Sequence, residues 1–173
     1  MKPLPFLCDH PDRAGGGKRV SDLKLPIEGE CRCGKVRIRI SAPPMLTMAC
    51  HCTGCQRMSA SAFSLSVAIP SAGFEVIAGE TVIGGLHGDM SKHHHCDWCK
   101  SWMFTRIEPD MGFVNVRPTM LEDTGWFTPF IETYTSEKLP WVTTPAEHSF
   151  ATFPEMSAYG DLIAGFARTK ATG

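Results

Sequence analysis

The stretch CHCTGCQR, residues 50–57, carries three cysteines within six positions. Two cysteine pairs complete the pattern, one in GECRCGKV (residues 29–36) and one in CDWC (residues 96–99). Cysteines one or two residues apart can bind the same metal ion, because a tight turn brings both sulfurs together, and clustered thiolates favour tetrahedral zinc. The sequence therefore predicts seven metal ligands: Cys31, Cys33, Cys50, Cys52, Cys55, Cys96 and Cys99.

Seven thiolates divide naturally into a group of four and a group of three. Four thiolates close a structural zinc site, whereas three leave a position open for water or substrate. We therefore expect two Zn2+ ions per chain, one structural and one catalytic or substrate-binding. Two other arrangements are open at this point. His51 could close a Cys3His site, or Cys52 and Cys55 could join Cys96 and Cys99 in a zinc-ribbon-like site, although the segment between them is longer than usual.

The composition indicates a globular protein. The chain of 173 residues fits one domain, and apolar residues make up 43% of it. A net charge of -1 gives no electrostatic attraction to nucleic acid or to an anionic membrane. No apolar run approaches the roughly 20 residues that cross a bilayer, and the first residues do not resemble a secretory signal. We expect a reducing, cytoplasmic location, where cysteines indicate metal ligands rather than disulfides. Cys8 has no partner cysteine nearby and is assigned to neither site.

Alternating apolar residues predict a mainly β domain. Val36, Ile38 and Ile40 alternate with arginines, and the stretch 63–69 alternates apolar with small residues. Further short strands are expected at residues 74–77, 81–86, 102–107 and 113–117. The three cysteine clusters are expected in the connections between strands. After Pro154, apolar residues at helical spacing predict one amphipathic C-terminal helix.

These patterns divide the chain into three segments. Residues 1–26 are rich in glycine, proline and charge and form an N-terminal extension, residues 27–154 form the zinc-binding β domain, and residues 155–173 form the C-terminal helix and tail. The run His93–His95 is interpreted as an exposed turn, and Glu132 as a surface strand residue. The four tryptophans are interpreted as core and zinc-shell packing: Trp98, Trp102, Trp126 and Trp141.

The order CxC, CxCxxC and CxxC resembles the glutathione-dependent formaldehyde-activating enzyme family, which includes centromere protein V-like members. The resemblance runs from about Gly29 to Trp141 and takes in FEVIAGE (residues 74–80) and KLPW (residues 138–141). It implies a β-tent fold of small twisted sheets joined by zinc. It also implies a structural zinc at Cys31, Cys33, Cys96 and Cys99, and a catalytic zinc at Cys50, Cys52 and Cys55.

The activity that the resemblance implies is the addition of glutathione to formaldehyde, a carbon–sulfur lyase-type reaction giving S-hydroxymethylglutathione. The sequence departs from the family at Lys100, where glycine usually follows the last CxxC, and at Glu132, where a histidine-containing strand often lies. Arg57 and Lys100 flank the clusters and are candidates for binding the carboxylates of glutathione. The alternative is a non-catalytic zinc module for protein interaction or thiol carriage. Nucleic-acid binding is disfavoured because there is no basic excess.

Overall fold

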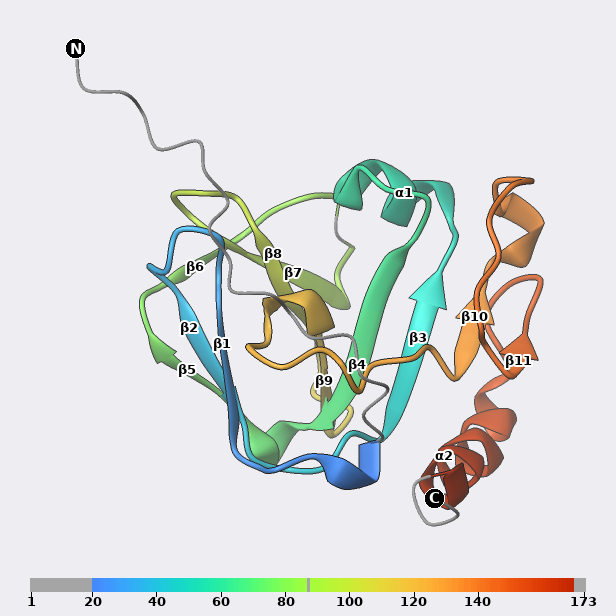
Figure 1. Cartoon of the computed structure of the whole chain (residues 1–173). Coiled ribbons are helices and arrows are strands. Elements are labelled where there is room, and N and C mark those ends of the chain that lie inside the picture. The colour runs from blue at the N-terminus through green and yellow to red at the C-terminus, as the bar shows by residue number, and fades with distance from the viewer. Residues whose placement is uncertain (1–19, 87, 170–173) are drawn as a thin grey trace.

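Two β-sheets, one of three strands and one of eight, form the body of the protein (Figure 1). The structure is a computed structural model, and it describes residues 20–86 and 88–169. The smaller sheet is antiparallel, in the order β1–β2–β5. Its strands are β1 (Ile27–Glu30), β2 (Arg37–Ile40) and β5 (Phe74–Ala78).

The larger sheet has the order β11–β10–β3–β4–β9–β8–β7–β6. Strand β10 runs parallel to both β3 and β11, and the other neighbours are antiparallel. The strands are β3 (Leu46–Cys50), β4 (Ser64–Pro70), β6 (Thr81–Ile83), β7 (Ser91–Cys96), β8 (Trp102–Ile107), β9 (Phe113–Val116), β10 (Ile131–Thr133) and β11 (His148–Ser149).

The main core lies between the two sheets. Ile38 and Ile40 of β2 are fully buried and belong to one apolar cluster with Val67 of β4 and Val116 of β9. Full burial of such a side chain contributes about 1.5–3 kcal/mol. The arginines that alternate with these isoleucines lie on the outer face of the small sheet, where Arg39 donates to Glu28 at 2.7 Å. The alternation in the sequence is therefore the inside–outside pattern of β2.

Two α-helices flank the larger sheet. Helix α2 (Tyr159–Thr169) packs Leu162 and Phe166 against Phe130 and Ile131, next to β10. Helix α1 (Thr53–Ser59) follows β3 directly and lies at the upper end of β3 and β4 in Figure 1. Neither helix has the length and apolar character that spanning a membrane requires, within the described residues. The mainly β fold with a C-terminal helix is confirmed.

Several local expectations are corrected. The run His93–His95 is not an exposed turn but the centre of β7, where each ring has a polar or aromatic partner. Trp98 and Trp141 are not core residues, since each is 76% exposed, whereas Trp126 is buried. Glu132 is a buried residue of β10, not a surface residue. Residues 1–19, with Cys8, and residues 170–173 of the expected tail lie outside the described residues.

Candidate metal centre

Four cysteines from two distant segments meet at one end of the structure. The sulfurs of Cys31, Cys33, Cys96 and Cys99 all lie within 4.8 Å of one another. The Sγ–Sγ distances are 3.5 Å between Cys31 and Cys33, and 3.8 Å between Cys33 and Cys96. Zinc–sulfur bonds of about 2.3 Å in a tetrahedron place the sulfurs about 3.8 Å apart. The four side chains therefore fit one zinc ion.

Two tight turns shape this first cluster. In the turn after β1, the backbone N–H of Val36 donates to the Cys31 sulfur at 3.3 Å, and Gly34 has a φ of +73°. In the turn between β7 and β8, the N–H of Lys100 donates to the Cys96 carbonyl at 3.0 Å, and Lys100 has a φ of +57°. A lysine thus occupies a left-handed position that favours glycine. Ser101 joins the two turns, because its Oγ accepts the backbone N–H of Arg32 at 3.3 Å and lies 3.2 Å from the Cys99 sulfur.

The second cluster is built where β3 passes into α1. Cys50 is the last residue of β3, Cys52 is the N-cap of α1, and Cys55 lies in its first turn. Their three sulfurs lie within 4.8 Å of one another. The Cys52 sulfur accepts the N–H of Cys55 at 3.3 Å, so the cap that begins the helix is itself a candidate metal ligand. The cysteines of both clusters lie partly in strands and a helix, which corrects the expectation that all lie in connections.

The electrostatics of the second cluster also suit a cation. A hydrogen bond from Cys55 lowers the pKa of the Cys50 thiol. The same hydrogen bond, together with burial, raises the pKa of Cys55. The three sulfurs therefore compete for negative charge, and a bound cation removes that competition by holding all of them as thiolates.

The grouping of the cysteines bears on the two alternatives left open. Cys52 and Cys55 do not group with Cys96 and Cys99 among the described residues, so the zinc-ribbon-like pairing is wrong. No described histidine joins the second group either. His51 is instead fully buried, with Nε2 lying 3.0 Å from Oε2 of Glu132. The arrangement is one cluster of four sulfurs and one of three.

A buried network fixes the second cluster against the rest of the sheet. The Glu132 carboxylate accepts hydrogen bonds at 2.7 Å from Lys138, Thr144 and Ser149 as well as contacting His51. Burial by itself would raise the pKa of Glu132, but these hydrogen bonds lower it to about 2. Glu132 therefore holds β10 in place through these hydrogen bonds, and Lys138 of the KLPW segment donates one of them.

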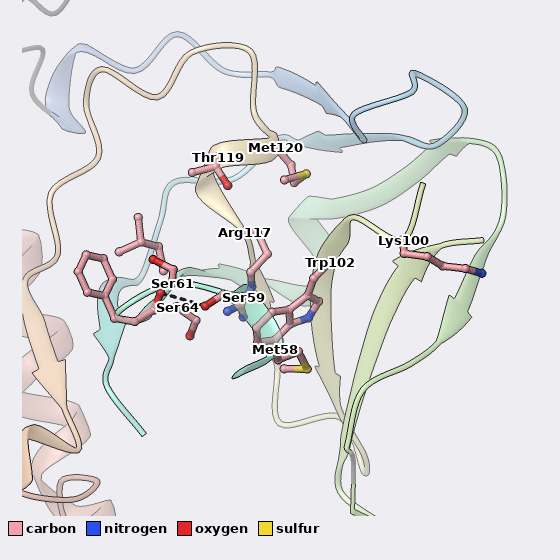
Figure 2. Close-up of a pocket in the computed structure, with 11 residues that line it drawn as sticks. Met58, Ser59, Ser61, Ser64, Lys100, Trp102, Arg117, Thr119 and Met120 are labelled. Carbon is pink, nitrogen blue, oxygen red and sulfur yellow. Dashed lines mark hydrogen bonds between the residues drawn. The ribbon is translucent and has the colours of Figure 1, made fainter. Parts of the chain in front are cut away.

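The two candidate contacts for glutathione lie at the surface. Arg57 is exposed in the last turn of α1. The Lys100 ammonium donates to Asp97 at 2.8 Å, and Figure 2 shows it pointing away from the other labelled side chains. The roles of both residues in ligand binding stay predictions.

A cavity beside α1 was not expected from the sequence. Its volume is about 410 Å3, and its lining includes Met58, Phe63, Trp102 and Arg117 (Figure 2). Arg117 is only 8% exposed. Tyr134 was also missed: it adopts a φ of +56°, and burial together with the charges of Cys52 and Cys50 raises its pKa. The one sequence signal for Tyr134 is its position shortly before the KLPW segment.

The chain is similar to one protein-family model and to a solved structure. A family model described as glutathione-dependent formaldehyde-activating enzyme matches residues 26–137, a range that includes all seven clustered cysteines. A crystal structure of a Rhodobacter sphaeroides protein is similar at 19% identity and a TM-score of 0.47, covering 55% of this chain and 87% of that one. No curated protein matches the chain.

Proposed function

This chain belongs to the glutathione-dependent formaldehyde-activating enzyme family, and from that premise we propose that it is a zinc-dependent enzyme of the carbon–sulfur lyase type. It would join glutathione, or another small thiol, to formaldehyde or a related small aldehyde, or split the same adduct. The observation that carries the proposal is the cluster of three sulfurs, Cys50, Cys52 and Cys55, which no described histidine completes.

The metal and the chain's own residues would have separate roles in the reaction. Zinc bound by these three cysteines would supply a position that holds a substrate thiol as its thiolate. In the addition, a carbon–sulfur bond forms, the carbonyl π bond breaks, and the proton lost by the thiol is balanced by one gained at the oxygen. A free thiol has a pKa near 8.5 and is only slightly ionised at neutral pH, so holding it as thiolate removes one part of the barrier.

The chain's own residues would position the reactants. Cys50, Cys52 and Cys55 hold the site at the rigid junction of β3 and α1, and the cavity of about 410 Å3 next to α1 offers space for a substrate. Holding thiol and aldehyde together converts a bimolecular encounter into a local reaction, which is a large rate term. Arg57 and Lys100 would bind carboxylates of the thiol substrate at the surface.

The second candidate function is a non-catalytic zinc module for protein interaction or thiol carriage. Cobalt substitution separates the two, because thiolate-to-cobalt absorption bands report the ligands of the ion. With the enzyme, glutathione changes these bands; Cys52→Ser, which disrupts the second cluster, abolishes the change. Bands that do not respond to glutathione would favour the module.

We place the protein in the cytoplasm, because thiolate ligands require reducing conditions.

A further inference from the structure

Two buried hydrogen-bond donors in the large cavity lack acceptors. Arg117 Nε and Trp102 Nε1 are both shielded from solvent and have no hydrogen-bond partner among the described residues. Both residues line the same cavity, and Figure 2 shows them side by side at its centre. The cationic carbon Cζ of Arg117 lies 4.0 Å from the centre of the Trp102 ring, so the two side chains form one unit. Buried donors are normally paired, so a ligand with acceptor atoms is the simplest partner for both.

Arg117 has no carboxylate partner. No described aspartate or glutamate pairs with it, and the only side-chain hydrogen bond it makes to a described residue is a long one of 3.4 Å from Nη2 to the Asn115 carbonyl. Burial lowers the pKa of Arg117 to about 10, and the charges of Cys55 and Cys50 oppose this. The guanidinium is therefore still charged at neutral pH. A buried cation without a carboxylate partner is costly for folding, which indicates that an anion binds next to it.

The other residues that line the cavity indicate which kind of anion fits there. No described acidic residue lines the cavity, whose polar members include Lys100 and the hydroxyls of Ser61 and Thr119. Met58, Phe63 and Met120 supply apolar surface. A planar guanidinium fork matches a carboxylate in two-point geometry, and the apolar surface suits the methylene groups that carry such a carboxylate.

The cavity adjoins the second cysteine cluster. Ser64 of β4, another lining residue, lies opposite Cys50 of β3 in the sheet. Met58 and Ser59 line the cavity from α1, the helix that also carries Cys52 at its N-cap. A ligand whose sulfur lies at the cluster can therefore extend into the cavity.

We propose that Arg117 and Trp102 form a carboxylate-binding subsite beside the second cluster. The carboxylate accepts from the Arg117 guanidinium and from Trp102 Nε1, and its charge offsets that of the buried guanidinium. The use of this subsite by the thiol substrate rests on the function proposed above; the anion subsite itself stands on the geometry of these two side chains.

The test is isothermal calorimetry on the zinc-loaded full chain with S-methylglutathione, which has both carboxylates but no free thiol. We expect it to bind, and glutathione to bind more tightly than its diethyl ester. Loss of a charge-assisted hydrogen bond in Arg117→Met should weaken binding of S-methylglutathione by about 10- to 100-fold, and loss of one neutral donor in Trp102→Phe by about 2- to 10-fold. Arg106→Met is the matched control, because Arg106 lies over Phe74 and Phe104 and does not line the cavity.

Several outcomes separate the possible explanations. If S-methylglutathione does not bind, or binds wild type and Arg117→Met equally, the subsite is wrong and Arg117 serves only as a counter-charge for the thiolates. If Arg117→Met also loses metal or stability, the result with Trp102→Phe decides. That substitution removes the Nε1 donor but keeps an aromatic ring at position 102 and the charge of Arg117. If S-methylglutathione binding depends on Arg117 while glutathione leaves the cobalt bands unchanged, the subsite stands and the proposed function fails.

Discussion

His51 Nε2 lies 3.0 Å from Oε2 of Glu132, with both side chains buried, and this contact connects the second cysteine cluster to β10. His51 stands between Cys50 and Cys52, and its backbone N–H donates to the Thr133 carbonyl at 3.0 Å. The spacing of the two cysteines is thus held from both the side chain and the backbone of the residue between them.

Glu132→Gln is expected to destabilise the protein by on the order of 2–3 kcal/mol, because it leaves a half-buried lysine and a buried histidine without their carboxylate. Thermal melting measures the loss. Glu75→Gln, which removes a carboxylate from an exposed ion pair with Arg39, should change stability by less than about 1 kcal/mol. Equal effects of the two substitutions would contradict the anchoring role of Glu132.

The lowered pKa of Glu132 predicts how the stability of the protein depends on pH. The pKa of Glu132 is lowered to about 2 in the folded protein, from the ordinary glutamate value of 4.5. Its contribution to stability is therefore fully present above about pH 4.5 and is lost as the pH falls towards 2. The stability difference between wild type and Glu132→Gln should be constant from pH 5 to 7 and should shrink below that range. A difference that grows on acidification would contradict the assignment.

Lys100→Gly should stabilise the chain. Lys100 holds a φ of +57°, where a non-glycine residue is strained by about 1 kcal/mol, and its side chain is largely exposed. We expect a rise in unfolding free energy of roughly 0.5–1 kcal/mol by thermal or denaturant unfolding. The matched control is Lys92→Gly in β7, which should destabilise because glycine weakens a strand. A Lys100→Gly protein less stable than wild type would show that the lysine makes a contact of structural value.

Arg57→Ala should raise the half-saturating glutathione concentration by about 2- to 5-fold, as expected for a partly solvated charge pair with a carboxylate. The assay follows the rate of aldehyde consumption above the spontaneous addition. Arg37→Ala provides the control, because Arg37 lies on the outer face of the small sheet and pairs with Glu28. An unchanged half-saturating concentration in Arg57→Ala would remove this residue from the binding site.

Cys96→Ser and Cys52→Ser should have different effects, the first on folding and the second on the second metal. Cys96 belongs to the cluster of four that joins the β1–β2 turn to the β7–β8 turn, and metal binding there is coupled to folding. We expect Cys96→Ser to fail to fold, and Cys52→Ser to fold but lose the second metal and any activity. Circular dichroism and melting compare them. A Cys96→Ser protein that melts like wild type would contradict the structural role of the first cluster.

The cysteine clusters were predictable in part because their chemistry is local. Spacing indicated which cysteines within one motif could share an ion, whereas the family resemblance joined Cys31 and Cys33 to Cys96 and Cys99. The alternation around Ile38 indicated β2. Strand β7 was hidden because SKHHHC has no apolar alternation. Its histidines are accommodated by neighbours that are distant in sequence: His94 stacks on Phe104 at 4.4 Å and hydrogen-bonds Thr81 at 2.8 Å. Tertiary partners of this kind leave no periodic pattern.

Other parts of the site have no sequence signal at all. Ser64 and Ser66 alternate with apolar residues in β4, a pattern typical of a strand with one exposed face, yet both serines are buried. Trp102 begins β8 and Arg117 directly follows β9, and only the folded chain shows that Arg117 Nε and Trp102 Nε1 have no acceptor among the described residues. A buried cation without a carboxylate partner cannot be recognised from spacing.

We expect the seven cysteines to hold two ions, one enclosed by four sulfurs and one bound by three. Native mass spectrometry of the reduced, unchelated, full-length protein counts these ions. We predict two zinc ions per folded wild-type chain and one per Cys52→Ser chain. A folded wild-type chain that carries no metal would contradict the claim.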